Sequence, residues 1–310
     1  MAALEIQGLC KSYTTGFWRK TLKPGLLPLD LTVEEGETFG FLGPNGAGKT
    51  TTLKLLMGII YPTAGSARIL GRHYHDPEVR RQIGFLPEQP YFYDYLSAAE
   101  LLDYYGELSG LSKEERRSRI PALLERVGLG DTGRQQLRKF SKGMLQRVGI
   151  AQAILHGPKI VFLDEPMSGL DPVGRREIRD LLQSMKSEGK TIFFSTHILS
   201  DAEALCDRVG VIHKGELRGI GVVSDLQSRN ADRSEVVWRG AAALPAVTGL
   251  LLESHVAGDV VRGVASSANV EAVLEKLRQQ RAALISLTPV QDALEDYFLA
   301  HTREKEAVRP

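Results

Sequence analysis

The residues with the clearest chemical potential form the glycine-rich stretch GPNGAGKTT, residues 43–51. Its pattern, Gly-x4-Gly-Lys-Thr, is that of a phosphate-binding loop, because glycines let successive backbone N–H groups face a phosphate that a side chain would block. Lys49 would neutralise the β- and γ-phosphates, and the Thr50 hydroxyl would ligate Mg2+. The loop follows an apolar run and precedes a helical pattern, so the phosphates would lie at a helix N-terminus, which favours anions. The stretch predicts a site for a nucleoside triphosphate; a glycine-rich turn that matches by chance is the alternative.

A second group of chemical side chains follows two other apolar runs. Residues 160–163 are continuously apolar, as in a strand buried on both faces of a parallel sheet, and they end in Asp164 and Glu165. The apolar run 191–194 is followed by residues 195–197, Ser-Thr-His. Open α/β sheets bind their ligands at the carboxyl ends of the strands. The acidic pair therefore lies where a ligand is expected.

The elements that must position these residues alternate between strand and helix. The opening of the chain is β-rich around one helix at the phosphate loop, with a strand at 29–33 and a polar loop, containing Phe17 and Trp18, over 14–28. From about residue 88 to 156 the patterns are helical. After that, strands and helices alternate, which predicts an α/β fold with a mostly parallel, helix-flanked sheet and an antiparallel β-rich N-terminal part.

Two features of the helical segment stand out. Ser97 with Glu100, and Ser112 with Glu115, match the capping box, in which serine and glutamate satisfy free N–H groups at a helix start, and Gly128 is a stop signal for the second helix. Four aromatic residues crowd one loop before these helices: Tyr91, Phe92, Tyr93 and Tyr95. We expect such a cluster to be core, and, failing that, to be the best candidate for a partner-docking patch.

The remaining 230–302 stretch has a different pattern. We expect strands at 234–238, 256–265 and 283–287, and helices at 244–252, 270–279 and 290–301. This predicts a small α+β accessory domain without a catalytic constellation, following an ATP-binding domain over 1–225 and preceding a charged tail at 303–310.

Composition narrows the possible partners and compartment. The 310 residues suit two domains, and 39 basic against 38 acidic residues give a net charge of +1 without an electrostatic footprint for nucleic acid. Cys10 and Cys206 have no metal-ligand spacing, which favours a reducing, cytoplasmic compartment. No signal peptide or membrane-spanning run is evident, so we expect any membrane connection to run through a partner.

Taken in order, these motifs resemble the ATP-binding subunit of an ABC transporter, over roughly residues 4–220. The loop is similar to Walker A, Gln89 to the Q-loop glutamine, FSKGMLQR at 140–147 to the signature motif, and 160–164 to Walker B with Glu165 beside it. Residues 168–171 resemble the D-loop, and His197 the switch histidine. Tyr13 lies where the family places an adenine-stacking aromatic. The small C-terminal domain and the Ser-Lys-Gly-Met segment look like those of the ABC-2 type exporter branch.

The resemblance implies a role for each matching residue. Asp164 would hold Mg2+, Glu165 would orient or deprotonate the attacking water, and His197 would contact the γ-phosphate and hold the water and Glu165 in place. Thr50 and Gln89 would join Asp164 at the metal, and Gln89 would link metal occupancy to movement of the helical segment. The expected ATP-binding residues are Tyr13, Gly43, Pro44, Asn45, Gly46, Ala47, Gly48, Lys49, Thr50, Thr51 and Gln89.

The signature segment departs from the family's usual Leu-Ser-Gly-Gly-Gln. Lys142 replaces the first glycine and Met144 the glutamine, while Ser141 and Gly143 remain to cap a γ-phosphate at a helix N-terminus. The resemblance implies that this segment, with Ser168 and Asp171 of the D-loop, faces ATP held by a second subunit. The expected assembly is a head-to-tail pair, a homodimer by preference, bound to membrane-spanning subunits at the inner face of the cell membrane.

Other functions compete with this interpretation. A soluble ABC-type ATPase acting on nucleic acid or ribosomes would usually carry two cassettes, a long coiled-coil insertion or a basic extension, which are not visible. A low-turnover ATP-sensing module is suggested by Lys142 and Met144, but Lys49, Asp164 and Glu165 are all present. A P-loop kinase or GTPase would leave the signature and residues 168–171 unexplained. The transported substrate and the direction of transport are not encoded in these motifs.

Overall fold

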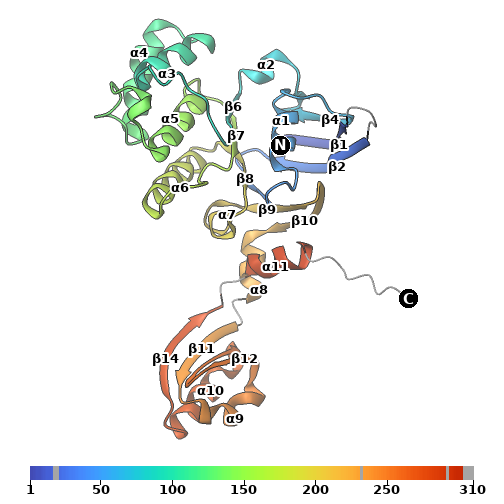
Figure 1. The fold of residues 1–310 in the computed structure, drawn as a ribbon, viewed down its shortest axis with the longest axis vertical. Helices are drawn as coiled ribbons and strands as arrows, with labels where there is room; N and C mark the ends of the chain where they lie inside the picture. The colour runs from blue at the N-terminus through green and yellow to red at the C-terminus, as the bar shows by residue number, and fades with distance from the viewer. Residues whose placement is uncertain (17–20, 231–232, 291–292, 303–310) are drawn as a thin grey trace. The chain divides into compact units, whose positions relative to one another are not determined.

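The computed structural model describes residues 1–16, 21–230, 233–290 and 293–302. The chain forms two compact units, unit 1 at Met1–Ile220 and unit 2 at Gly221–Pro310 (Figure 1). The predicted tail at 303–310, and Phe17 and Trp18, lie outside the described residues. The domain limits expected from the sequence stay predictions. No helix within the described ranges is both long and apolar enough to cross a bilayer.

Unit 1 contains two sheets and several helices. Its strands are β1 (Ala2–Thr15), β2 (Thr21–Glu34), β3 (Thr38–Leu42), β4 (Ala64–Ile69), β5 (Arg72–His73), β6 (Ile83–Leu86), β7 (Ile160–Asp164), β8 (Thr191–Thr196), β9 (Arg208–His213) and β10 (Glu216–Val222), whose last two residues belong to unit 2. Its helices are α1 (Lys49–Leu56), α2 (Pro77–Arg80), α3 (Ala98–Leu108), α4 (Lys113–Arg126), α5 (Lys142–Ile154), α6 (Pro172–Ser187) and α7 (Leu199–Leu205), with a 3-10 turn at Leu137–Lys139.

The central sheet has the strand order β10-β9-β3-β8-β7-β6, and its strands from β9 to β6 are parallel. Every residue of β3, β7 and β8 is buried, which confirms the buried strands expected at 160–163 and 191–194. The rings of Phe39, Phe162 and Phe193 pack together in the core, with centroids 5.5 and 5.7 Å apart. Because these strands are parallel, the residues that follow β3, β7 and β8 meet at one edge of the sheet. The fold is thus α/β, as predicted.

The antiparallel sheet, in the order β2-β1-β4-β5, corrects one expectation. Residues 21–28 are not part of a loop, because β2 begins at Thr21 and pairs with β1 from Thr15 onward. Pro24 and Pro28 mark the region as a loop in sequence, yet both lie on an edge strand, where a missing N–H is tolerated. The pairing brings Tyr13 opposite Lys23, beside the phosphate loop.

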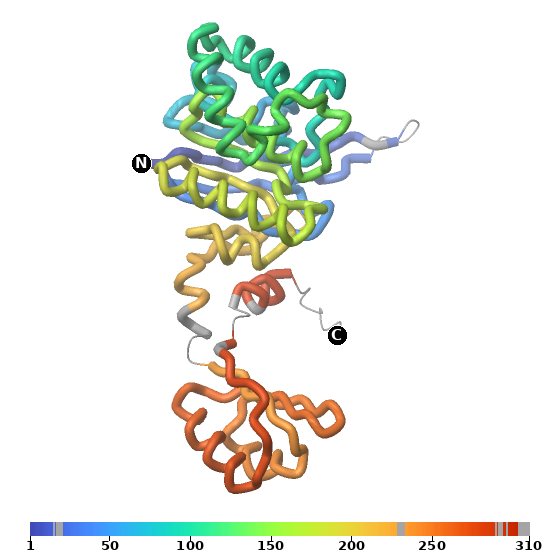
Figure 2. The backbone as a smooth tube through the Cα atoms, turned by 90° about the vertical axis from the view of Figure 1, so that its left-hand side faces the viewer, coloured from blue at the N-terminus to red at the C-terminus, as the bar shows by residue number. Residues whose placement is uncertain are grey.

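The helices α3, α4 and α5 form one group at an end of unit 1, green in both views (Figure 2). Both predicted capping boxes are present: the serine Oγ accepts from the glutamate N–H, and the glutamate Oε2 accepts from the serine N–H at 2.8 Å. α4 ends at Arg126, and Gly128 follows with φ of 67°. The local signals therefore define this segment well.

The aromatic loop before α3 contradicts the expectation of a core cluster. Tyr91, Tyr93 and Tyr95 are 90%, 50% and 60% exposed, and only Phe92 is partly covered. On the surface, the Tyr93 ring contacts the rings of Tyr95 and Tyr104. The expectation of burial rests on composition alone, whereas in the structure the Phe92 ring packs near Gly149 of α5 and the three tyrosine rings stay exposed.

Unit 2 contains an antiparallel sheet in the order β12-β13-β11-β14. Its elements are α8 (Val223–Asn230), β11 (Arg233–Arg239), α9 (Leu244–Val247), β12 (Leu251–Ala257), β13 (Val260–Ser266), α10 (Ser267–Gln279), β14 (Ala283–Pro289) and α11 (Ala293–Thr302), with 3-10 turns at Ala241–Ala243 and Thr248–Leu250. The predicted helix 244–252 is therefore only one turn long, and the predicted strand 256–265 is the hairpin of β12 and β13. Gly258, with φ of 62°, makes the turn between them.

Candidate functional site

The phosphate loop connects β3 to α1 at the carboxyl edge of the central sheet. Gly46 and Gly48 have φ of 79° and 112°, in the left-handed region that glycine adopts without a steric penalty. A Cβ on Gly43 would collide with the backbone of Ile212 in β9. α1 begins without a side-chain cap or an acidic residue in its first turn, so its N–H groups stay available to an anion. The loop has the conformation that its glycines predict.

Lys49 crosses the inside of this loop and is almost fully buried. Its ammonium donates to the carbonyl oxygens of Gly43 at 2.6 Å and Pro44 at 3.3 Å. It also forms an ion pair with Glu165 Oε1 at 3.0 Å, although the alignment is poor enough that this oxygen accepts no hydrogen bond. The structure thus unites Lys49 with Glu165, which are far apart in the sequence.

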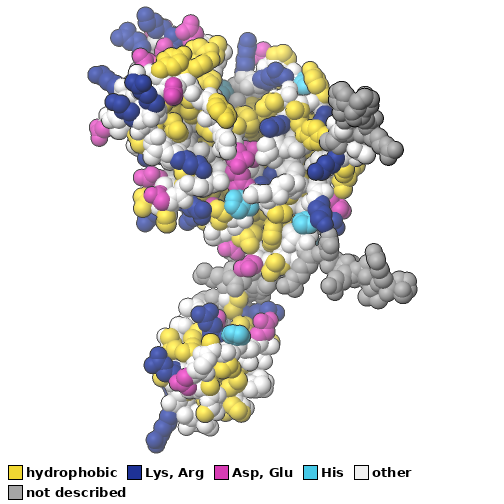
Figure 3. Space-filling view, in the orientation of Figure 1, with side chains coloured by type: hydrophobic (Ala, Val, Ile, Leu, Met, Phe, Trp, Pro, Cys, Tyr) yellow, Lys and Arg dark blue, Asp and Glu magenta, His cyan; other side chains and the backbone are white. Residues whose placement is uncertain are grey.

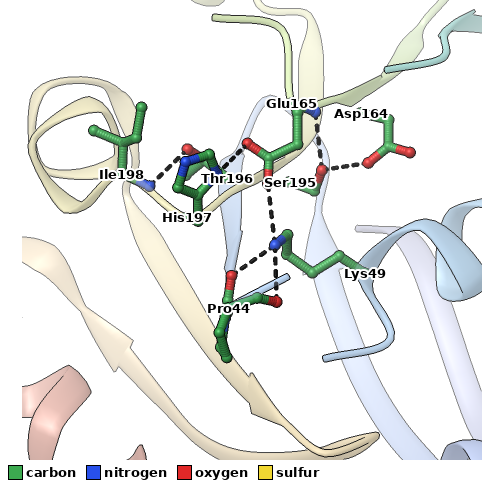
Figure 4. A network of polar contacts seen from close by, with 9 residues as sticks. Pro44, Lys49, Asp164, Glu165, Ser195, Thr196, His197 and Ile198 are labelled. Atoms are coloured by element: carbon green, nitrogen blue, oxygen red, sulfur yellow. Dashed lines mark hydrogen bonds and ion pairs between the residues drawn. The ribbon is translucent and has the colours of Figure 1, made fainter. Parts of the chain in front are cut away.

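The polar residues at the ends of β7 and β8 form one network (Figure 4). Ser195 Oγ donates to Asp164 Oδ1 at 2.6 Å, and the Glu165 N–H donates to Ser195 Oγ at 3.0 Å. The Glu165 carboxylate lies between two partners, because its Oε2 is 2.9 Å from Nδ1 of His197 while its Oε1 faces Lys49. Glu165 and Asp164 are buried, and His197 is exposed.

Asp164 has the properties of a metal ligand in a dry site. Burial raises the pKa of its carboxyl group, against the opposing effect of hydrogen bonds from Ser195 and Thr50. A cation that replaced a proton there would relieve the cost of burying the carboxylate. The Thr50 hydroxyl beside it supplies a second oxygen, and oxygen ligands are those that Mg2+ prefers. The residues present therefore fit Mg2+.

A cavity of about 620 Å³ opens above the loop, within the size range of small-ligand sites. At one end, the Tyr13 ring packs so closely on Gly25 that a Cβ there would collide with it. The Lys11 ammonium lies 5.5 Å from the centre of the same ring. The residues that line the cavity are Tyr13, Lys23, Pro24, Gly25, Pro44, Asn45, Gly46, Ala47, Gly48, Lys49, Thr50, Thr51, Glu88 and Glu165.

Some of the predicted residues do not line this cavity. Gln89 is exposed, and its neighbour Glu88 lines the cavity instead, so the predicted contacts of Gln89 with ATP and Mg2+ stay predictions. Ser141 is the N-cap of α5 and accepts from the Met144 N–H at 3.3 Å. Like Lys142 beside it, Ser141 is exposed to solvent.

The D-loop segment connects the network to the signature helix. The Ser168 N–H donates to the Glu165 carbonyl at 3.1 Å, and Asp171 caps α6 by accepting from the Gly174 N–H at 2.7 Å. The Lys142 side chain covers Gly169, where a Cβ would collide with the lysine ammonium. Gly143 is partly exposed, and a Cβ there would make only ordinary contacts, with Leu170 at 3.7 Å and Ser141 Oγ at 4.0 Å.

Sequence reasoning missed several residues of the site. Ser195 is the central hydroxyl of the network, although the sequence shows it only as a polar residue between the run 191–194 and His197, with no role of its own. Lys23, Pro24 and Gly25 were assigned to a loop, although β2 brings them to the cavity wall. Glu88 matches no motif, whereas its neighbour Gln89 does. All of these depend on strand pairing rather than on a local motif.

Comparison with known proteins identifies what the chain resembles. A family model described as "ABC transporter" matches residues 26–168. The uncharacterized ABC transporter ATP-binding protein sll0415 of Synechocystis sp. is 44% identical, over 97% of this chain and 85% of the relative. The bacitracin transport ATP-binding protein BcrA of Bacillus licheniformis is 39% identical, over 87% of this chain and 90% of the relative.

Solved structures give the same result for the fold. One, the structure of an ATP-binding subunit of an ABC transporter, is 34% identical with a TM-score of 0.64, over 73% of this chain and 92% of the other. Another, the dimeric post-hydrolysis state of the ATP-binding cassette MJ0796 bound to ADP and Pi, is 27% identical with a TM-score of 0.65. It covers 71% of this chain and 98% of the other.

Proposed function

Since the chain belongs to the ABC transporter family as an ATP-binding, ATP-hydrolysing subunit, we propose that the network at the ends of β3, β7 and β8 performs the hydrolysis. Glu165 is the residue that orients and deprotonates water. The observation that supports this most is the position of its buried carboxylate, between Lys49 at 3.0 Å and His197 at 2.9 Å beside the phosphate loop.

The roles follow from the contacts. Backbone N–H groups of the loop and the Lys49 ammonium bind the phosphates, and Tyr13 stacks on the base. Asp164 and the Thr50 hydroxyl would hold Mg2+, which would supply positive charge against the phosphates. When phosphates occupy the loop, Lys49 turns from Glu165 toward them, which frees Oε1 of Glu165 for water. His197 retains Oε2 and keeps the carboxylate aimed at the γ-phosphate position.

We further propose that ATP joins two copies head to tail. Ser141, Gly143 and Met144 lie outside the cavity of their own chain, and the N-terminus of α5, where Ser141 lies exposed, is available to a phosphate held by another copy. The dimeric structure of the related cassette with ADP and Pi supports this assembly.

Sedimentation tests the dimer. Glu165→Gln with Mg-ATP should sediment as a dimer at tens of micromolar, because ATP is retained and bridges the copies. Ser141→Arg in the same background replaces the hydroxyl that would contact the phosphate of the other copy. This variant should sediment as a monomer. A monomer in the Glu165→Gln variant would contradict the proposal.

The membrane partner is proposed to dock beside the aromatic loop. A groove of about 800 Å³ lies there, and Tyr91 at its rim is 90% exposed. Arg80 and Arg81 on one side and Tyr105 and Leu108 of α3 on the other also line it. Figure 3 shows hydrophobic side chains exposed among Lys and Arg on this unit. A mixed apolar and cationic groove suits a helix from a cytoplasmic loop of a membrane protein.

We also propose a location and a direction of transport. The chain works at the inner face of the cell membrane through such a partner. Export is the proposed direction because the small C-terminal domain resembles that of the ABC-2 type exporter branch, and the bacitracin transport ATP-binding protein BcrA is similar over 90% of its own length. The substrate of this chain stays open.

Purification from solubilised membranes tests the docking site. Tagged Glu165→Gln with Mg-ATP should bring down a stoichiometric multi-span protein, identified by mass spectrometry. Tyr91→Ala in this background should lose that partner, whereas Tyr61→Ala, a matched change of a 73% exposed tyrosine that does not line the groove, should keep it. Recovery of soluble proteins or ribosomes alone would move the ATPase to the soluble alternative.

A further inference from the structure

Ser195 is a fully buried hydroxyl in the middle of the central sheet. It belongs to β8 and lies between two parallel neighbours, opposite Asp164 of β7 and Phe41 of β3. Its exposed fraction is 0%. A serine in a strand otherwise filled by Ile192, Phe193 and other buried residues gives up apolar packing, so its hydroxyl needs a compensating role.

The hydroxyl uses both of its hydrogen-bonding capacities on the site. It donates to Asp164 Oδ1 at 2.6 Å and accepts from the Glu165 N–H at 3.0 Å. Asp164 accepts a hydrogen bond and the Glu165 N–H donates one. The side chain that joins them must therefore donate and accept at the same atom. A hydroxyl meets that requirement, and Ala or Val does not.

The residue that Ser195 holds has an unusual backbone. Glu165 has φ of 49°, in the left-handed region that a side chain with a Cβ disfavours. Such a conformation persists only when its surroundings impose it. The Glu165 N–H is held twice by Ser195, by its hydroxyl at 3.0 Å and by its carbonyl at 3.2 Å. This backbone geometry sends the Glu165 carboxylate toward Lys49 and His197.

We propose that Ser195 is a positioning residue that fixes the Asp164 carboxylate and the Glu165 backbone in one geometry. The Mg2+ ligand and the water-activating residue then move as a unit. This inference rests on the roles given to Asp164 and Glu165 in the proposed function.

A purely structural role would predict that removal of the Ser195 hydroxyl destabilises the fold, whereas the contacts that remain predict that it does not. Without the hydroxyl, Asp164 retains the hydrogen bond from Thr50, and the Glu165 N–H retains the Ser195 carbonyl. Ser195→Ala therefore strands no buried group, and it removes a single oxygen atom. We expect the chain to fold normally, and the loss to fall on the geometry of the site.

The experiment compares Ser195→Ala with Thr38→Val and Glu165→Gln in the full chain. Thr38 is a matched control, because its hydroxyl is equally buried, on neighbouring β3, and has no hydrogen-bond partner among the described residues. The readouts are kcat and KM for ATP, the melting temperature, and the affinity for Mn2+ in the presence of ADP, measured as free Mn2+ by electron paramagnetic resonance.

Ser195→Ala should lower kcat about 10- to 100-fold and weaken Mn2+ binding about tenfold, as changes of residues that hydrogen-bond to metal ligands do. Its KM for ATP and its melting temperature should match those of Thr38→Val. Unchanged kcat and Mn2+ affinity would overturn the inference, and so would a parallel loss of stability and ATP binding. Full turnover by Glu165→Gln would instead refute the roles in the proposed function, which separates the two failures.

Discussion

Units 1 and 2 both cover a sheet with helices, yet they bury different kinds of side chain. Within the described residues, the buried charged and hydroxyl side chains all belong to unit 1, among them Lys49, Asp164, Glu165 and Ser195. The core of unit 2 consists of apolar side chains such as Val236, Val261 and Leu277, together with Trp238.

This difference indicates that the buried polar side chains of unit 1 serve its chemistry, while the apolar core of unit 2 serves packing. Burying a charge costs free energy unless the charge is paired. In unit 1, Lys49 and Glu165 are buried as an ion pair where the parallel strands end together. The antiparallel strands of unit 2 end at opposite edges, so their termini do not gather at one place. Substitutions in the polar network of unit 1 should therefore affect activity at constant stability, and substitutions in the apolar core of unit 2 should affect stability at constant activity.

The largest effect is expected from Lys49→Ala. Removing the ammonium leaves the phosphates without their buried cation and should lower kcat/KM by about a thousandfold. Steady-state phosphate release measures this, with circular dichroism to check the fold. Lys54→Ala, on the exposed side of α1, is the matched control and should retain turnover. Unchanged turnover in Lys49→Ala would refute the assignment of the phosphate loop.

Leu277→Ala should act on unit 2 alone. The side chain is 2% exposed in α10, and its truncation should destabilise the unit by about 2–5 kcal/mol. Urea unfolding followed by the fluorescence of Trp238, in chains that carry Trp18→Phe, reports on the unit, and Leu252→Ala, at 54% exposure, should change little. ATP turnover measured in the same samples should stay near wild type. A large loss of turnover would show that the units are energetically coupled.

The smallest effect concerns acid sensitivity of unit 1. Burial lowers the pKa of His156 below its ordinary value of 6.5, so the unfolded chain binds the proton more readily. Its contribution to stability is full above pH 6.5 and is lost as the pH falls through the folded pKa, with a slope of at most about 1.4 kcal/mol per pH unit. Urea unfolding between pH 7.5 and 5.5 should show a flatter dependence in His156→Gln. An identical slope would contradict this.

Local motifs predicted the parts of the molecule that local chemistry determines. The phosphate loop, the capping boxes and the apolar strands β7 and β8 were confirmed, because glycine conformations, N-caps and apolar runs act over a few residues. The same signals misplaced residues 21–28, where two prolines conceal an edge strand. They also missed the hairpin of β12 and β13.

The site was predictable only as far as its residues belong to motifs. Lys49, Asp164 and Glu165 were identified from sequence and meet in the structure. Ser195 escaped because its partners come from the register between β7 and β8, which no local pattern reveals. The exposed loop around Tyr91 escaped for a related reason, since burial depends on whether another element covers a residue.

Glu165 in the unit 1 network is proposed to activate the water that hydrolyses ATP. We would measure phosphate release and ATP affinity for purified wild type and Glu165→Gln, with Mg2+ present. Glu165→Gln keeps the size of the side chain but removes its charge and its ability to accept a proton. We predict release about a thousandfold slower, with ATP affinity nearly unchanged. Release at the wild-type rate would contradict the account, because the carboxylate between Lys49 and His197 would then have no part in the chemistry.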